Sequence, residues 1–149
     1  MWKKHRRLAI AAIILVCVLG GSVAFWGADA AVAVHESERA TPRQMTTTYL
    51  RDARWGNCPA TLALTLAHTN PWCNDLLAYA VGLPRLESYR VTSNAQLVPK
   101  SVGGANEECV QSTVRAPHFQ GPGMAATFQW GWCWTRTAHG WRLYDQGQG

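Results

Sequence analysis

Four large aromatic residues near the C-terminus occupy every second position of one stretch: Phe128, Trp130, Trp132 and Trp134. In a β-strand successive side chains point to opposite faces, so residues two apart share a face. A strand is the only regular structure that aligns these four rings, and their common face must be covered by other apolar groups. The pair His139-Gly140 then provides a turn, and the alternation resumes at Trp141 and Leu143. The stretch therefore predicts a β-hairpin.

A long apolar run occupies the N-terminus. Leu8 to Trp26 is a stretch of 19 residues without charge, close to the roughly 20 that a helix needs to cross a bilayer. By the positive-inside rule, the basic residues in front of it predict a cytoplasmic N-terminus and an extracytoplasmic remainder. The run is interpreted either as a retained anchor or as a signal peptide cleaved near Ala30, at the Ala28-Asp29-Ala30 site. Its length favours the anchor, and both interpretations export the rest of the chain.

The net charge of +5 is concentrated in front of the apolar run. Lys3, Lys4, Arg6 and Arg7 supply four of the 14 basic residues, which leaves ten to face nine acidic residues in the rest of the chain. A nucleic-acid-binding domain carries its positive charge as a patch on the folded surface. The distribution therefore argues against a nucleic-acid partner.

The cysteines indicate an oxidising compartment. Cys17 lies in the apolar run, and the exported part retains an even number: Cys58, Cys73, Cys109 and Cys133. Four cysteines allow three pairings. We favour Cys58–Cys73 and Cys109–Cys133, because each pair lies within one half of the domain, and each bond would stabilise the fold by about 2–4 kcal/mol. No short Cys-x-x-Cys spacing favours zinc, so no metal site and no cofactor are predicted.

Helix signals precede the strands. Thr41 suits an N-cap, Pro42 the first helical position, and Gln44 the reciprocal position of a capping box, whereas Gly56 suits a helix terminator. Two further helices are expected, one over residues 60–68, opened by Cys58-Pro59, and one over residues 72–79.

Strand signals dominate the second half of the chain. They cover residues 88–92, 96–98 (read as a continuation past a bulge) and 109–115, followed by the hairpin. Because helices come first and antiparallel strands later, the predicted class is α+β. After an N-terminal transmembrane helix, we expect two or three helices packed on a curved antiparallel sheet of three to four strands.

The predicted organisation has three parts. Residues 1–27 form a basic cytoplasmic tip and a transmembrane anchor or signal peptide. Residues 28–40, which are small and polar, form a tether or a helix that extends from the membrane. Residues 41–149 form the extracytoplasmic domain.

This layout resembles the nuclear-transport-factor-two-like, or cystatin-like, superfamily. The residues that carry the likeness are Tyr49-Leu50 through Trp55-Gly56-Asn57, the Phe128-to-Trp134 strand and Gly140-Trp141-Arg142-Leu143. The resemblance implies a cone-shaped fold whose sheet wraps a pocket, in a superfamily of enzymes, binding modules and assembly parts. In particular, the layout resembles that of small exported actinobacterial members, such as mammalian-cell-entry-associated accessory proteins. An anchor-plus-domain layout also occurs in the inner-membrane assembly factor of type IV secretion systems.

Two roles are open for the aromatic residues. Trp130, Trp132 and Trp134, with Tyr79, could line a pocket for a small apolar ligand, since such sites are mostly apolar. Alternatively, the tryptophans pack against the helices as core, and this is the role we favour.

Catalytic signals are weak. Asp75 and Tyr79 share a helical face and offer the one acid–base pair of an isomerase or dehydratase. His68, His118 and His139 lie far apart, and none has an adjacent partner to shift its pKa. No nucleophile elbow, phosphate-binding loop or zinc-protease motif occurs.

The sequence thus predicts a non-enzymatic, single-pass accessory protein of the cell membrane, whose extracytoplasmic domain binds another envelope protein. An exported small-ligand binder with a Trp-lined pocket is the first alternative, and an isomerase- or dehydratase-like enzyme is the second.

Overall fold

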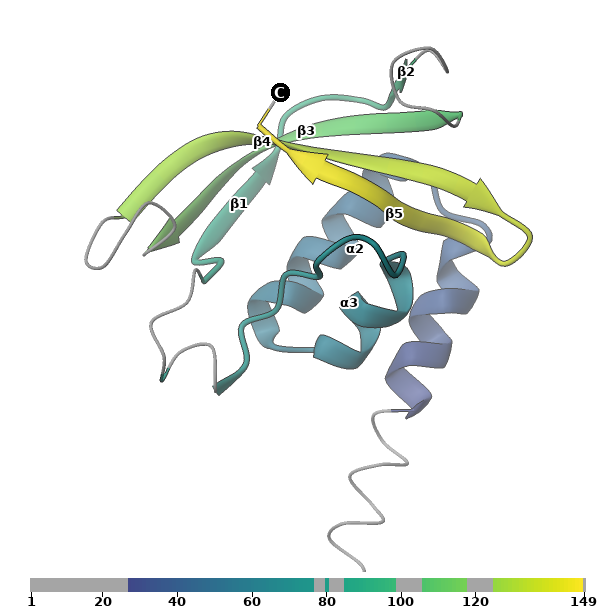
Figure 1. Cartoon of the computed structure of the whole chain (residues 1–149), viewed down its shortest axis with the longest axis horizontal. Helices are drawn as coiled ribbons and strands as arrows, with labels where there is room; N and C mark the ends of the chain where they lie inside the picture. Colours follow the sequence, from purple (N-terminus) through teal and green to yellow (C-terminus); the bar gives the residue numbers. More distant parts are fainter. Residues whose placement is uncertain (1–26, 77–79, 81–84, 99–105, 118–124, 149) are drawn as a thin grey trace, which may run out of the picture.

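The computed structural model describes residues 27–76, 80, 85–98, 106–117 and 125–148. Within them, three helices lie against one face of a curved five-stranded antiparallel sheet (Figure 1). The α+β class and the covering of one sheet face by helices are therefore confirmed. The sheet has one strand more than the three to four expected.

Helix α2 (Pro42–Trp55) follows its sequence signals at both ends. The hydroxyl of Thr41 accepts a hydrogen bond from the Gln44 backbone N–H, and the Gln44 side chain accepts one from the Thr41 N–H, so the capping box is complete. Gly56 ends the helix in the left-handed conformation, with φ of 76°. Glycine adopts this conformation readily because it has no Cβ atom. One face of α2 is buried, including Met45, Tyr49 and Ala53.

Helix α3 (Cys58–Leu64) is shorter than predicted. The expected helix ran to residue 68, but Thr65 instead forms a parallel bridge with Leu143, and the Leu66 N–H donates to the Leu143 carbonyl at 3.0 Å. The chain thus leaves the helix in order to pair with the edge of the sheet.

The prediction of a helix over residues 72–79 is wrong for its described first turn, residues 72–75, which is irregular. Asn74 takes its hydrogen bonds from distant segments, because its side-chain amide donates to the Arg54 and Leu86 carbonyls and its side-chain oxygen accepts from the Leu86 N–H. Its backbone N–H donates to the Ala53 carbonyl at 2.8 Å. Residues 77–79 lie outside the described part. Leu76 and Ala80, on either side of those residues, are helical, and residues 27–37 are helical as well.

The sheet contains β1 (Ser88–Val91), β2 (Gln96–Val98), β3 (Glu107–Pro117), β4 (Ala125–Thr137) and β5 (Gly140–Gly147). The order is β1-β3-β4-β5, and β2 also pairs with β3. Strands β1 and β2 pair one after the other along β3, opposite residues 112–115 and 107–109 respectively. The chain breaks between them, where the N–H groups of Thr92 and Ser93 both donate to the Gln111 carbonyl. Residues 96–98 are therefore a separate strand, which explains the extra element.

The predicted hairpin is formed by β4 and β5. Its register runs from Thr137 opposite Gly140 to Gly131 opposite Gly147, with an irregularity between Cys133 and Trp134. Gly140 closes the turn at φ of 93°, a conformation that L-residues with side chains rarely adopt.

Both favoured disulfides are present. Cys58–Cys73 joins the start of α3 to the irregular segment before residue 76, across 15 residues. Cys109–Cys133 joins directly paired residues of β3 and β4, across 24 residues. The first bond holds the helical layer together, and the second links the two central strands.

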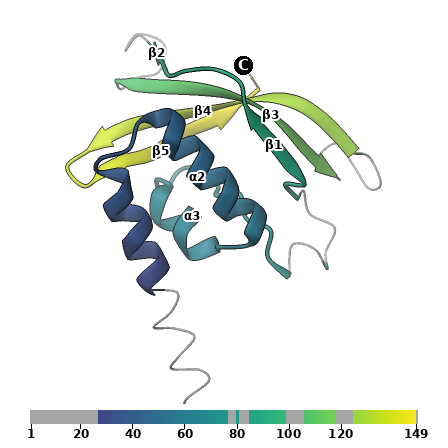
Figure 2. The same ribbon diagram turned by 180° about the vertical axis from the view of Figure 1, so that it is seen from behind.

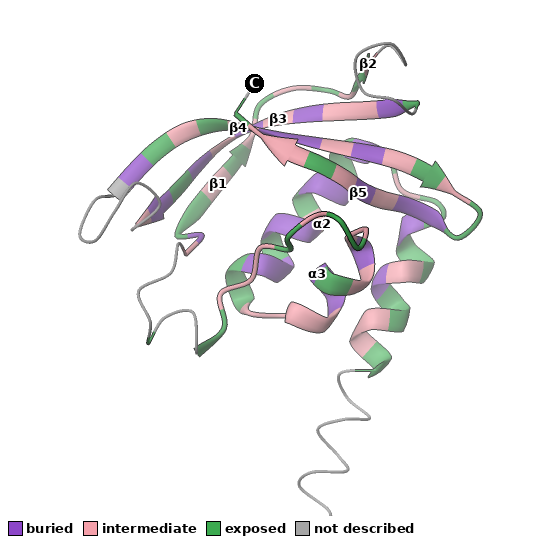
Figure 3. Ribbon diagram, in the orientation of Figure 1, coloured by how far each residue is buried: buried purple, intermediate pink, exposed green. Residues whose placement is uncertain are grey.

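The core lies between the sheet and the helices (Figure 3). Trp132 and Trp134 have no exposed surface, and they pack with Tyr49, Leu50, Leu64 and Leu143. Phe128 and Trp130, on the same face of β4, are half-buried against this cluster. The alternation in the sequence thus marks the face of β4 that the helices cover.

No helix in the described part of the chain is long and apolar enough to cross a membrane. The run from Leu8 to Trp26, in which a transmembrane helix is predicted, lies outside the described residues.

Candidate interaction surface

The helix formed by residues 27–37 is part of the domain and not a free tether. Its first residue lies away from the sheet, and its last turn reaches the β4–β5 turn (Figures 1 and 2). Ala33 and Ser37, one helical turn apart, are buried. The segment predicted as a tether or a helix is therefore a helix that contributes to the core.

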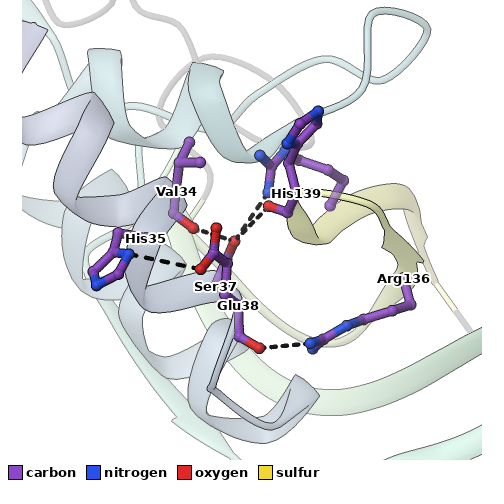
Figure 4. Close-up of polar contacts among 7 residues, drawn as sticks. Val34, His35, Ser37, Glu38, Arg136 and His139 are labelled. Atoms are coloured by element: carbon purple, nitrogen blue, oxygen red, sulfur yellow. Dashed lines mark hydrogen bonds and ion pairs between the residues drawn. The ribbon is translucent and has the colours of Figure 1, made fainter.

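A group of polar contacts fixes the end of this helix to the hairpin (Figure 4). The Ser37 hydroxyl donates to the Val34 carbonyl at 2.6 Å, and it accepts a hydrogen bond from the Arg142 guanidinium at 3.0 Å. Arg136 donates to the Glu38 carbonyl from the other side of the hairpin. Burial lowers the pKa of Arg142 from its usual value, while the carboxylate of Glu38 opposes this effect.

Two neighbouring contacts complete the attachment. The Trp141 ring N–H donates to the Ala40 carbonyl at 2.9 Å, and the Arg136 guanidinium lies 5.2 Å above the Trp141 ring. These contacts, together with the close approach of Gly140 to Ser37, define the helix–hairpin junction.

A groove of about 1180 Å³ is lined by segments of the helical part of the domain. Among these segments, helix α3 and the first described turn of helix 27–37 lie on the side away from the sheet (Figure 1). Four segments line the groove: the start of helix 27–37, the end of α2, helix α3 and residues 71–75. The Cys58–Cys73 disulfide holds the last two of these together. Gly27, the first described residue, is itself part of the lining.

Two exposed apolar side chains line this groove. Five large hydrophobic residues of the described part are exposed, and Trp55 and Leu62 are the two of them that belong to the lining. Trp55 is 79% exposed and Leu62 is 63% exposed. Single exposed apolar residues are ordinary, but a cluster of them marks an interaction site.

Both acidic and basic side chains lie on the segments around the groove. Desolvation raises the pKa of Asp52, and the negative charges of Glu36 and Asp29 raise it further, whereas Arg51 lowers it through a contact of 3.2 Å. The Arg54 guanidinium lies 5.9 Å from the centre of the Trp55 ring. Apolar surface therefore dominates the groove, with acidic and basic groups close by.

The residues predicted to bind a ligand are only partly placed together. The rings of Trp130 and Trp132 each contact the Trp72 ring at an angle, at 5.6 Å between ring centres, and the Trp134 ring contacts that of Tyr49 at 5.9 Å. The ring N–H of Trp132 donates to the Ser112 hydroxyl at 2.7 Å, and that of Trp134 donates to the Thr46 hydroxyl at 2.9 Å. Tyr79 lies outside the described residues. Trp132 and Trp134 are thus enclosed and fully hydrogen-bonded in the core.

Tyr49 ties the core to the segment after α3. Its hydroxyl accepts a hydrogen bond from the Trp72 N–H at 2.8 Å. Burial raises its pKa from 10.0 to about 12, and the hydrogen bonds with Trp72 and Thr65 oppose this rise.

A pH-dependent loss of stability follows from this shift. Between pH 10 and about 12 the unfolded chain releases the Tyr49 proton while the folded chain retains it. The free energy of unfolding should therefore fall as the pH rises through this window, by up to about 1.4 kcal/mol per pH unit. Urea unfolding followed by far-UV circular dichroism, at pH values from about 9 to 11, measures this slope. The Tyr49→Phe variant should have a shallower slope, and equal slopes would contradict the assignment.

The residues considered for acid–base chemistry do not form a site in the described part. Asp75 is exposed at the groove, and its suggested partner Tyr79 lies outside the described residues. The Nε2 atom of His68 contacts the Tyr144 carbonyl at 2.8 Å, and His139 is exposed in the hairpin turn. His118 also lies outside the described residues.

One group has the composition of a metal site. Ligand atoms of Glu107, Cys109 and Cys133 lie within 4.8 Å of one another. The two sulfur atoms are joined in a disulfide, and a metal needs the thiolate form. The group as it stands therefore lacks the sulfur ligands that a metal would require.

The groove was not foreseen from the sequence. Trp55, Leu62 and the disulfide between residues 58 and 73 come from separate segments, and only the packing of those segments brings them together. The one signal was the presence of Trp55 and Leu62 outside the apolar periodicity of their helices.

No protein-family model, no curated protein and no solved structure gives a match to this chain. The likeness to the cystatin-like superfamily stays a prediction.

Proposed function

We propose that this protein is a non-enzymatic accessory protein of the cell envelope. A membrane anchor formed by the apolar N-terminal run holds an extracytoplasmic domain, and this domain binds another envelope protein through the side that faces away from the membrane. The partner surface is the outer face of the sheet.

The observation that carries this proposal is the rigid attachment of helix 27–37. A flexible tether would let the domain rotate freely, whereas buried Ala33 and Ser37 and the helix–hairpin junction fix the domain to the residues that follow the anchor. Since the first described turn of this helix lies on the side opposite the sheet (Figure 2), the sheet would point away from the bilayer. A fixed orientation of this kind suits a protein that meets its partner at a set height.

The enclosed tryptophans support binding of a protein over binding of a small ligand. Trp132 and Trp134, which would have lined the ligand pocket, have no exposed surface and no unsatisfied ring N–H. The outer face instead presents polar and charged side chains, such as exposed Thr127 and Gln129 and, directly opposite Thr127 on β3, exposed Arg115. An interface between two proteins that associate reversibly is on the whole no more apolar than the rest of their surfaces, so a face of this kind can bind a protein.

Site-specific photo-crosslinking in the membranes of the native host tests the proposal. A photoreactive amino acid at position 127 should give an adduct with one envelope protein, whereas the same group at Leu62, on the opposite side, should not give that adduct. Reversal of this pattern, or recovery of the full-length chain in the soluble fraction after cell disruption, would contradict the proposal.

A further inference from the structure

We propose that the groove end of the domain rests on the outer surface of the lipid bilayer, with Trp55 and Leu62 inserted into its interfacial layer. This inference rests on the membrane anchor of the proposed function and goes beyond it, because it assigns a lipid-binding surface to the folded domain.

The groove lies next to the end of the N-terminal apolar run. Gly27 lines the groove, and the residue before it, Trp26, ends the apolar run of 19 residues. If that run crosses the bilayer, its outer end lies at the membrane surface, and the groove is within one residue of that end. No intervening segment can hold the groove away from the lipid, because helix 27–37 is fixed to the domain at the helix–hairpin junction.

The lining of the groove includes apolar side chains that are exposed to solvent. Trp55 and Leu62 are more than half exposed, and a side of the domain that meets a bilayer offers them the apolar environment that they lack in water. Tryptophan is enriched at membrane–water interfaces, where its ring sits at the level of the headgroups. Arg54, stacked near the Trp55 ring, can place its guanidinium among the lipid phosphates at the same depth.

The charges indicate which kind of lipid contact is formed. Asp29 and Asp75 line the groove, and neither Lys nor Arg occurs among its described lining residues. Such a lining does not attract anionic headgroups, so binding should depend on apolar insertion and not on the negative charge of the membrane. Phosphatidylcholine vesicles, which carry no net charge, are therefore a suitable probe.

A fluorescent amino acid, placed in the full-length chain, tests the inference. An environment-sensitive residue replaces Leu62 in one variant and Leu97 in a matched control. Leu97 matches Leu62 in residue type and is 70% exposed, but it lies on β2, on the opposite side of the domain (Figure 1). Each variant is reconstituted into phosphatidylcholine vesicles that contain lipids with a nitroxide on the upper part of the acyl chain. Far-UV circular dichroism establishes that both are folded.

The probe at position 62 should shift its emission to the blue and be quenched several-fold more strongly than the probe at position 97. Adding anionic phosphatidylglycerol should leave this difference unchanged. Equal, weak quenching at both positions would overturn the inference, and so would a blue shift at position 62 without lipid quenching, since that would place a protein in the groove. Carbonate extraction of the same vesicles separates the two proposals: a protein that washes off lacks the anchor, whereas an anchored protein with a water-exposed position 62 refutes only the lipid surface.

Discussion

Replacing Trp132 with alanine is expected to lower the free energy of unfolding by about 3–5 kcal/mol. The side chain is fully enclosed and contacts both Tyr49, at 5.5 Å, and Trp72, at 5.6 Å. Its removal leaves a cavity between the sheet and α2. It also takes away the ring N–H that donates to the Ser112 hydroxyl, a buried group. Urea unfolding with both disulfides intact, followed by far-UV circular dichroism, measures the loss.

The matched control is Trp55→Ala. This change removes a side chain of the same size from a position that is 79% exposed, so the free energy of unfolding should change by about 0.5 kcal/mol or less. If the two variants lost stability equally, the enclosed position of Trp132 would be contradicted.

Replacing Gly140 with alanine is expected to destabilise the folded domain by about 4 kcal/mol. A side chain at φ of 93° adds strain of about 1–3 kcal/mol. The new Cβ atom would overlap the Ser37 hydroxyl and lie 2.8 Å from the Glu38 nitrogen, which adds a steric cost of about 1–3 kcal/mol. Because the clash falls on the helix–hairpin junction, residues 27–37 should detach before the rest of the domain unfolds. Hydrogen exchange of the amides in this helix measures the detachment.

Gly147→Ala serves as the control for this substitution. Gly147 also lies on β5, but an added Cβ atom would meet no atom within 4 Å, and no positive φ is involved. Hydrogen exchange in helix 27–37 should then stay as in the parent protein. Rapid exchange in both variants, or in neither, would argue against the role of Gly140 in the junction.

Much of the fold could be predicted because its signals are local. The capping box of Thr41 and Gln44, the terminating Gly56 and the alternation before Trp134 each depend on residues close in sequence, and the structure follows them. The length of α3 and the path of residues 72–75 depend instead on distant partners. The carbonyl of Leu143 accepts a hydrogen bond from the backbone just after α3, and the Asn74 side chain donates hydrogen bonds to the carbonyls of Arg54 and Leu86. No local pattern contains such information.

The candidate surface was beyond prediction for a related reason. Trp55 and Leu62 carry no motif, and their common exposure results from the packing of four segments. The attachment of helix 27–37 was hidden as well, because small residues such as Ala33 and Ser37 suit both a tether and a tight helix–hairpin contact. Small side chains give little hydrophobic signal even where they permit the closest packing.

The order of the disulfides along the chain has a consequence for the oxidative folding of the protein. The bonds join Cys58 to Cys73 and Cys109 to Cys133, which are neighbouring cysteines along the chain, so neither loop encloses or crosses the other. If the domain crosses the membrane in chain order, each cysteine can pair with the next to emerge, and the native bonds arise without reshuffling. Such a chain can complete its oxidation with an oxidant alone, whereas a crossed pattern would depend on an isomerase to correct early errors.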